Sequence, residues 1–165
     1  MNYYVLFVQT QWCERLISVL NKNKDVVAFI PKMEMYRRDS TEYVLDVMFP
    51  GYVFVKTEMD QFEFDQFLFH LQEQKKGFIK ELKREEVSCL IEQEIEFLND
   101  FLDDSYILRM SYGARIDGRS IPFKGPLVKY MNHIKRVNFY RNVAYLDIEF
   151  MHRDIMVGFT VNKAK

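Results

Sequence analysis

The feature that most constrains the fold is the order of apolar runs in the first half of the chain, which alternates between strand-like and helix-like periods. Residues 3–8 are β-branched or aromatic throughout, which is typical of a buried strand. Polar residues 21–24 end the helix that follows. The apolar positions of this helix are Cys13, Leu16, Ile17 and Leu20. A strand followed at once by an amphipathic helix predicts an α+β domain.

The next part of the chain predicts further strands and a second helix. A second strand is expected over residues 26–36, and Pro31 indicates an edge or a bulge within it. Strand-like residues follow at 43–48 and 51–56, on either side of Phe49-Pro50. Asp60 and Glu63 have the spacing of a capping box, so they predict a helix start, and a last strand is expected at 77–82. The resulting β-α-β-β-α-β order matches the ferredoxin-like arrangement.

From residue 87 onward the sequence predicts one helix and then a series of short strands. Apolar residues at helical spacing predict one more helix over 87–102, whose acidic outer side we interpret as a solvated face. Beyond residue 105, short strand-like runs are separated by turn signals at 117–118 and 125–126. Alternation over 143–150 and a further run at 155–161 continue the pattern. These features predict a small antiparallel barrel.

The net charge changes sign near residue 105, where the short strand-like runs begin. Residues 1–104 hold 12 Lys and Arg against 20 Asp and Glu, a net −8, whereas residues 105–165 hold 11 against 4, a net +7. We therefore expect domains at 1–104 and 105–165, with a polyanion such as nucleic acid near the second.

Several classes of protein are disfavoured by simple features. No apolar run approaches the roughly 20 residues needed to cross a bilayer, and the first residues do not resemble a signal peptide. Cys13 and Cys89 have no CxxC spacing, so we expect two reduced thiols and a cytoplasmic protein without a membrane partner.

Catalytic and metal-binding motifs are not found in the sequence. His70, His133 and His152 share no ligand spacing, and no glycine-rich loop precedes a helix. Cys13 is a conceivable nucleophile, but its place on an apolar stripe favours a buried structural cysteine. We therefore expect no enzyme activity, no metal and no cofactor.

Cations and aromatic residues alternate in one short region of the basic part. The aromatic residues there are Phe123, Tyr130, Phe139 and Tyr140. The expected RNA-binding residues are Lys124, Lys129, His133, Lys135, Arg136 and Arg141. Cations that contact phosphates, beside rings that stack on bases, are typical of RNA-binding surfaces. The alternative is that the rings fill the barrel and the cations only solvate it.

Three stretches in the first part resemble the N-terminal domain of NusG-type transcription elongation factors. They are residues 3–10, residues 29–31 and residues 48–55, of which the last reads Met-Phe-Pro-Gly-Tyr-Val-Phe-Val and is the specific part. The C-terminal part resembles the KOW domain of that family. The similar stretches there are 113–116, 125–127 and 146–151. This resemblance implies an SH3-like barrel after the ferredoxin-like domain.

Within the family, the chain looks most like the LoaP class of specialised antiterminators. The features that carry this are the stretch Phe-Ile-Pro-Lys-Met-Glu at 29–34, the long acidic helix and the strand ending at residue 151. Lys129 and Asn132 stand where related KOW sequences have glycine, so that turn is expected to differ here.

The resemblance also implies partners. The first domain of such factors docks on the clamp helices of the largest RNA polymerase subunit, which implies polymerase-binding roles for Tyr4, Phe7, Phe49, Pro50, Tyr52 and Phe54. Alternation alone would place Phe7 and Phe54 on the core or helix-facing side. The first loop of the family lies near the non-template DNA strand. It implies DNA contacts by Gln9, Thr10, Gln11, Trp12 and Arg15, although the family often has glycine in place of Gln11.

The resemblance to the LoaP class thus implies a monomeric antitermination factor that binds RNA polymerase with one domain and a leader RNA hairpin with the other, which the basic charge of the second part favours. The nearest alternative is a housekeeping elongation factor. In such factors the KOW domain binds a ribosomal protein or a termination factor. A small enzyme on the ferredoxin-like fold is a second alternative. A ribosome-associated RNA binder is a third, favoured if the aromatic residues around Phe49 and Tyr52 are buried.

Overall fold

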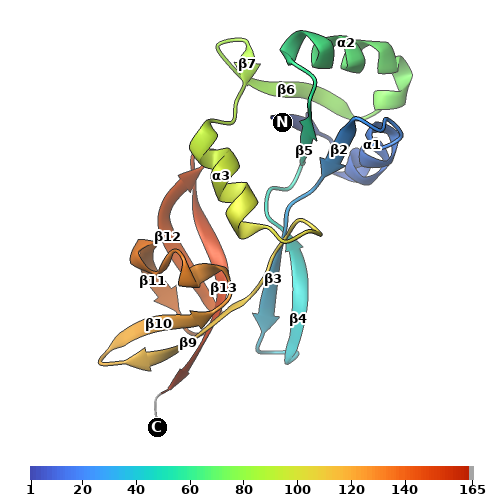
Figure 1. The fold of residues 1–165 in the computed structure, drawn as a ribbon. Coiled ribbons are helices and arrows are strands. Elements are labelled where there is room, and N and C mark those ends of the chain that lie inside the picture. The colour runs from blue at the N-terminus through green and yellow to red at the C-terminus, as the bar shows by residue number, and fades with distance from the viewer. Residues whose placement is uncertain (164–165) are drawn as a thin grey trace. The chain divides into compact units, whose positions relative to one another are not determined.

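The structure, a computed structural model, describes residues 1–163 and divides into two compact units that are discontinuous in sequence (Figure 1). Unit 1 comprises Met1–Ile30 and Phe49–Ile95, and unit 2 comprises Pro31–Met48 and Glu96–Lys165. A segment from the middle of the first expected domain therefore folds with the C-terminal strands. The division of function at residue 104 stays a prediction, but the folded units do not follow a single cut there.

Unit 1 is built on an antiparallel sheet with the strand order β2-β5-β1-β6-β7. Its strands are β1 (Asn2–Val8), β2 (Val26–Phe29), β5 (Tyr52–Thr57), β6 (Phe78–Arg84) and β7 (Val87–Ser88). The strand β1 pairs with both β5 and β6, so it occupies the middle of the sheet. This order confirms the ferredoxin-like arrangement predicted from the sequence.

Two helices cover one face of this sheet. They are α1 (Cys13–Leu20), which follows the short 3-10 turn η1 (Thr10–Trp12), and α2 (Gln61–Leu71), which precedes η2 (Gln72–Lys75). Cys13 and Leu16 of α1 and Phe64 of α2 pack with alternate residues of β1 in a common core. The expected burial of Cys13 is confirmed.

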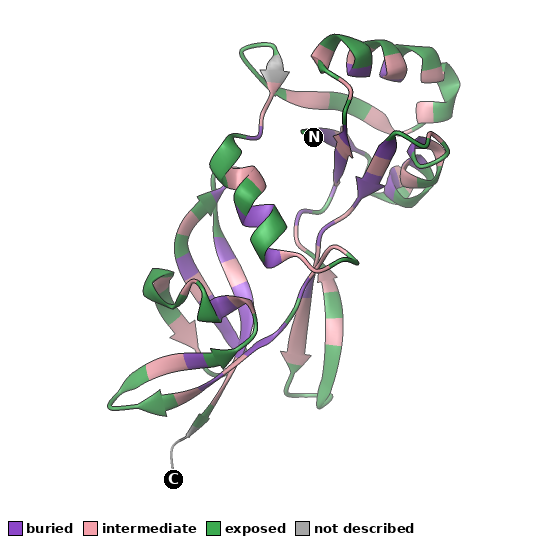
Figure 2. Cartoon of the chain, in the orientation of Figure 1, coloured by how far each residue is buried: buried purple, intermediate pink, exposed green. Residues whose placement is uncertain are grey.

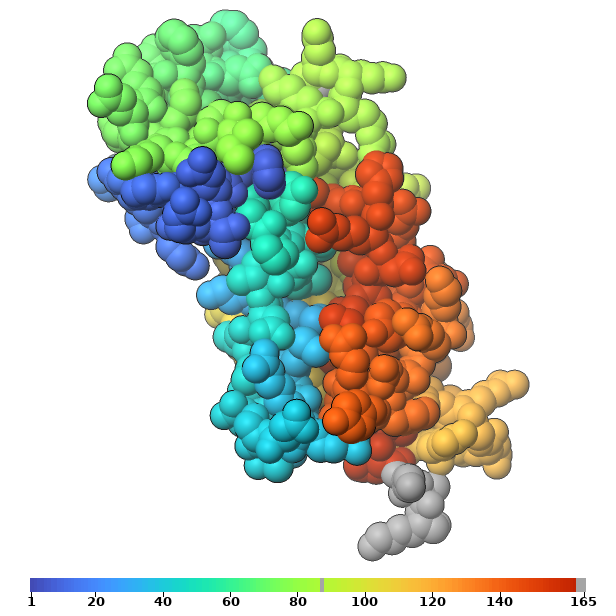
Figure 3. All heavy atoms as spheres, turned by 180° about the vertical axis from the view of Figure 1, so that it is seen from behind, coloured from blue at the N-terminus to red at the C-terminus, as the bar shows by residue number. Residues whose placement is uncertain are grey.

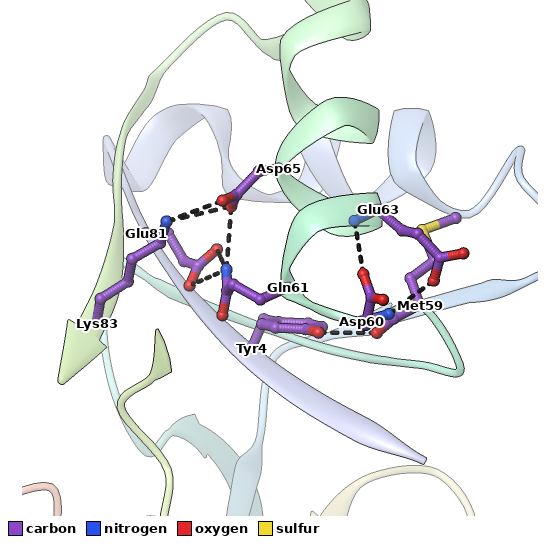
Figure 4. Close-up of polar contacts among 8 residues, drawn as sticks. All are labelled: Tyr4, Met59, Asp60, Gln61, Glu63, Asp65, Glu81 and Lys83. Atoms are coloured by element: carbon purple, nitrogen blue, oxygen red, sulfur yellow. Dashed lines mark hydrogen bonds and ion pairs between the residues drawn. The ribbon is translucent and has the colours of Figure 1, made fainter. Parts of the chain in front are cut away.

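The capping box predicted at the start of α2 is present. The Asp60 carboxylate accepts the Glu63 N–H at 2.8 Å, and the Glu63 carboxylate accepts the Asp60 N–H at 2.8 Å (Figure 4). Two backbone donors that the helix itself leaves unpaired are thereby satisfied, which determines where α2 begins.

The third helix, α3 (Glu92–Phe101), is shorter than the sequence predicted. It begins at Glu92 rather than near residue 87 because Ser88 pairs with Lys83 of β6 as a short strand. The Ile91 N–H donates to the Glu94 carboxylate at 3.0 Å, which satisfies one backbone donor at this helix start.

The segment assigned to unit 2 from the first half of the chain is a hairpin. Its strands are β3 (Lys32–Arg37) and β4 (Glu42–Val47), and β3 also pairs in parallel with β8 (Ile107–Leu108). The single strand expected over 26–36 is therefore two strands in two different units, with Pro31 at the break. Proline has no N–H to donate to a ladder, so a strand interruption at this residue has a direct physical cause.

The main sheet of unit 2 has the order β10-β9-β13-β12-β11. The strands are β9 (Ser111–Ile116), β10 (Arg119–Lys124), β11 (Ile134–Asn138), β12 (Val143–Phe150) and β13 (Arg153–Lys163), with the 3-10 turns η3 (Pro126–Val128) and η4 (Met131–His133) between β10 and β11. Asp117 and Gly118 both have positive φ in the turn between β9 and β10, as a tight hairpin requires. The barrel expected to be antiparallel has one parallel pairing, between β13 and β9.

Buried residues lie both in the sheet of unit 2 and in the C-terminal half of α3, where Figure 2 colours them purple. Phe97 stacks on Phe101 with ring centroids 4.1 Å apart and lies 5.7 Å from Phe150 of β12. The hairpin is held to the same unit at Gly158, where a Cβ would lie 2.5 Å from the Glu34 carbonyl oxygen and 2.3 Å from the Met110 sulfur. A side chain at Gly158 would push β13 away from β3.

Assignment to compact units changes the charge balance. Unit 2 carries 14 Lys and Arg against 12 Asp and Glu, a net +2, and unit 1 carries 9 against 12, a net −3. The asymmetry of the linear sequence shrinks mainly because unit 2 includes Glu96, Asp100, Asp103 and Asp104, whereas the hairpin adds 3 Lys and Arg against 4 Asp and Glu. Among the helices of residues 1–163, none is long and apolar enough to span a membrane.

Candidate functional site

The sheet face of unit 1 that is turned away from α1 and α2 is rich in aromatic residues. In the pairing of β1 with β5, Val5 lies opposite Phe54 and Phe7 opposite Tyr52, so these four side chains share one face. We define the aromatic face by its five rings, which are Phe7, Phe29, Phe49, Tyr52 and Phe54. Adjacent rings in this set lie 5.4 to 5.8 Å apart.

Exposure differs sharply within the aromatic face. Phe54 and Phe49 are buried, at 0% and 4% exposure, whereas Phe7 and Tyr52 are half-buried and Pro50 is exposed. Phe7 and Tyr52 are therefore the two rings of the expected docking set that a partner reaches without rearrangement. Of the two positions on which the ribosome-associated alternative depended, Phe49 is buried and Tyr52 is not.

Tyr4 lies on the opposite side from the other expected docking residues. Its ring stacks on Phe64 of α2 with centroids 4.1 Å apart. Figure 4 shows the Tyr4 hydroxyl, which donates to the Met59 carbonyl at 2.7 Å. Burial, together with the nearby Glu81 carboxyl group, raises the pKa of Tyr4 to about 12. A polymerase-binding role is expected for Tyr4 from the family resemblance, but its ring is 3% exposed and forms an internal contact between the sheet and α2.

The expected DNA-contacting residues lie together at η1 and α1. Gln9, Thr10, Gln11 and Arg15 are exposed, and Trp12 is half-buried. The Trp12 indole is flanked by two cations, with the Lys76 ammonium 4.3 Å and the Arg15 guanidinium 5.5 Å from the ring centroid. Lys76 lies outside the DNA-contacting set expected from the sequence, although the Lys75-Lys76-Gly77 run before β6 is a visible signal.

Gly77 makes this arrangement possible. Its φ is +89°, and a Cβ at this position would lie 2.3 Å from the Trp12 Cβ. The Gln9 N–H donates to the Gly77 carbonyl at 2.9 Å, which ties the loop before η1 to the start of β6. The close approach of two backbones positions Trp12 beside Lys76.

All six expected RNA-binding side chains of unit 2 are exposed, but they are not equivalent. Three of them contact acidic partners. Lys129 contacts Asp100 at 2.7 Å, His133 contacts Asp147 at 3.0 Å and Lys135 contacts Asp154 at 3.5 Å. Asp100 also accepts a hydrogen bond from Tyr130 at 2.7 Å, and the bonds from Lys129 and Tyr130 lower the pKa of Asp100. These three side chains therefore already have acidic partners within unit 2.

The other three cations of the set contact tyrosines, two at the ring and one at the hydroxyl. The Lys124 ammonium lies 5.8 Å from the Tyr112 ring centroid. The Arg136 guanidinium lies 4.1 Å from the Tyr145 ring centroid, and Arg141 lies 3.4 Å from the Tyr145 hydroxyl. Cross-strand pairing of Arg136 with Tyr145 accounts for the close stacking.

The structure adds an arginine from the hairpin to this surface. Arg38 donates to the Phe139 carbonyl at 2.9 Å, and its guanidinium lies 5.9 Å from the Tyr140 ring centroid. We define the arginine–tyrosine row as Arg38, Tyr140, Arg141, Tyr145 and Arg136. Arg38 and Phe139 are 101 positions apart, so no local pattern in the sequence could have joined them.

Comparison with known proteins identifies the family. The NusG family model, described as transcription termination factor nusG, matches residues 1–98 of this 165-residue chain. The match includes all of unit 1 and the hairpin segment, which is more than half of the chain. The chain belongs to the NusG family. A search of curated proteins gave no significant match.

Membership in the NusG family makes this protein a transcription elongation- or termination-related factor. Factors of this family interact with RNA polymerase and are not enzymes. The fold of this NusG-family chain agrees with that assignment, since a ferredoxin-like unit of strands and helices is accompanied by a strand-rich β unit.

Proposed function

We propose that this NusG-family protein is a specialised antitermination factor of the LoaP type. It docks on the clamp helices of RNA polymerase through the aromatic face of unit 1 and contacts a leader RNA hairpin through unit 2. It acts in the cytoplasm as a monomer, by binding alone and without a cofactor. The observation that carries the RNA part of the proposal is the arginine–tyrosine row, which offers cations and stackable rings on one exposed surface.

Polymerase docking is supported by the character of the aromatic face. Phe7 and Tyr52 are half-buried neighbours, with ring centroids 5.4 Å apart. Large rings in a patch that becomes desolvated provide most of the binding energy in protein interfaces. The exposed Pro50 extends the same edge, whereas Tyr4 takes no part in the proposed contact.

Contact with the non-template DNA strand is proposed for the loop around Trp12. The partly exposed indole can stack on an unpaired base, while Arg15 and Lys76 contact the phosphates on either side. The exposed Gln9, Thr10 and Gln11 supply hydrogen-bonding groups next to it.

A housekeeping elongation factor is the second candidate, and one observation favours it. Unit 2 has a net charge of only +2, and Lys129, His133 and Lys135 contact acidic groups within it. A surface whose cations are partly neutralised suits a protein partner better than it suits RNA, because phosphate binding depends on unneutralised positive charge.

The two candidates are separated by the affinity of the full-length protein for a stem-loop RNA, measured across a salt series against an unstructured RNA of equal length and composition. For an antiterminator we expect selective binding of the stem-loop that weakens steeply with salt, with a slope of about 0.7 to 0.9 per phosphate contacted. Equal binding of both RNAs would favour the housekeeping factor.

Charge reversal separates the RNA contact from the polymerase contact. The variant Lys135→Glu/Arg136→Glu is expected to lose stem-loop binding and to retain polymerase binding. The matched control is Lys22→Glu/Lys24→Glu, which reverses two exposed charges in unit 1. Equal loss of RNA and polymerase binding in the first variant would contradict the proposed division of labour.

A further inference from the structure

Unit 2 contains a groove between the hairpin and the turn that joins β11 to β12. Its volume is about 420 Å³. In Figure 3 the blue and cyan atoms of the hairpin lie directly beside the orange and red atoms of the C-terminal strands. All of the residues that line the groove belong to unit 2, so it is a feature of one compact unit.

The floor of the groove is formed by methionines. Met33 is buried, and Met35, Met48 and Met156 are half-buried. Methionine side chains are unbranched and polarizable, so they adapt to a flat ring and make favourable contacts between sulfur and aromatic groups. Such a floor suits a planar, partly apolar group better than it suits an ion.

The rim of the groove is cationic and aromatic. Tyr140 is 71% exposed and lies against the Arg38 guanidinium, which is oriented by its hydrogen bond to the Phe139 carbonyl. Arg37 and Arg141 complete the cationic rim, and Arg37 lies 3.4 Å from Asp46 in an exposed ion pair. An exposed pair of this kind contributes little stability, so the guanidinium is available to another anion.

We propose that this groove binds one unpaired nucleotide of an RNA strand. The base stacks on Tyr140 over the methionine floor, and the arginines of the rim contact the phosphates on either side of it. Asp39 and Asp46 also line the groove, and their carboxylates are acceptors for the amino group of a base such as cytosine. The inference rests on the RNA binding proposed above. It extends the RNA-binding surface to the β3–β4 hairpin, which lies far from the C-terminal strands in the sequence.

Continuity with the proposed RNA surface supports an RNA strand as the occupant. Arg141 lines the groove and also contacts the Tyr145 hydroxyl, and Tyr145 in turn stacks with Arg136 of β11. The arginine–tyrosine row therefore leads from the groove to the cations proposed to contact the stem. A stem held at Arg136 places its single-stranded flank along this row.

The test compares two RNAs on the full-length protein: a stem-loop alone and the same stem-loop with a single-stranded cytidine tail. The tail is expected to tighten binding by about tenfold, which corresponds to stacking of one base. Tyr140→Ala is expected to abolish this gain, so that this variant binds the tailed and the untailed stem-loop with equal affinity. Tyr140→Phe is expected to keep the gain, because it retains the ring.

The matched control is Tyr43→Ala, which removes another exposed ring of unit 2 that does not line the groove. It is expected to keep the tail-dependent gain. Stem-loop binding without any gain from the tail, or an equal gain in Tyr140→Ala, would overturn this inference alone and would favour an apolar peptide as the occupant. Binding of neither RNA would overturn the inference together with the proposed RNA function.

Discussion

At the scale of single residues, Gly77 allows the Trp12 side chain to lie close to the start of β6, and substitution of this glycine tests how much stability depends on that close contact. Gly77→Ala is expected to destabilise the protein by about 1 kcal/mol through its positive φ, and by more through the clash with Trp12. Gly118→Ala is the control, because Gly118 also has positive φ but its Cβ would meet no atom within 4 Å. Denaturant unfolding measures both, and equal losses would contradict a tight approach at Trp12.

Tyr52 tests the proposed docking surface. Tyr52→Ala is expected to weaken polymerase binding by about 2 kcal/mol or more, because a half-buried ring at the centre of an interface contributes strongly. Affinity for purified polymerase is the measurement, and the unfolding curve of the variant shows whether the fold is intact. The same affinity in wild type and variant would exclude Tyr52 from the interface.

Glu81 makes the stability of unit 1 depend on pH. Burial raises the pKa of Glu81 from 4.5 to about 7, despite hydrogen bonds from Gln61 at 3.1 and 3.2 Å (Figure 4). The folded state therefore binds a proton more tightly than the unfolded state, so the contribution of this group is fully present below about pH 4.5 and is lost as the pH rises through 7.

The corresponding variant is Glu81→Gln, which cannot ionise. Its free energy of unfolding is expected to exceed that of wild type at about pH 8 and to be similar near pH 4. Urea unfolding at both pH values measures the difference. A difference that is the same at both values would show that Glu81 is not the titrating group.

At the scale of elements, the β3–β4 hairpin is held to unit 2 by Glu34. Its carboxylate accepts the Met110 N–H at 3.1 Å and pairs with Arg109 at 3.1 Å. Glu34→Ala leaves the Met110 donor unpaired and is expected to destabilise unit 2 by about 1 to 3 kcal/mol. Glu42→Ala, on the exposed end of the same hairpin, is the control in thermal unfolding. Equal effects of the two variants would contradict this role of Glu34.

Sequence patterns predicted most elements but not their assignment to units. The capping box at Asp60 and the strand-like residues 51–56 were interpreted correctly, because hydrogen bonds and apolar periodicity act over a few residues. The sequence predicts one strand over 26–36, because Pro31 indicates an edge or a bulge but no local window shows that β2 and β3 pair in different sheets.

At the scale of the whole molecule, the hairpin makes unit 2 discontinuous. A fragment of residues 96–165 lacks β3 and β4, so the surface around Gly158 and Met110 loses its cover. We expect this fragment to melt at a lower temperature than unit 2 in the full chain, and a peptide of residues 31–48 to raise that temperature. Circular dichroism measures both, and an unchanged melting temperature on addition of peptide would contradict the discontinuous unit.

Patterns of neighbouring residues are enough to predict the ferredoxin-like order, the helix start at Asp60 and the family resemblance. Contacts between distant parts of the chain place Tyr4 against α2, Lys76 beside Trp12 and Arg38 beside Tyr140, and no local pattern predicts them. Long-range packing also sets the charge balance, since Glu96, Asp100, Asp103 and Asp104 belong to the unit with the basic strands. The physical reason is that long-range pairing determines which face of a strand is covered and which charges meet.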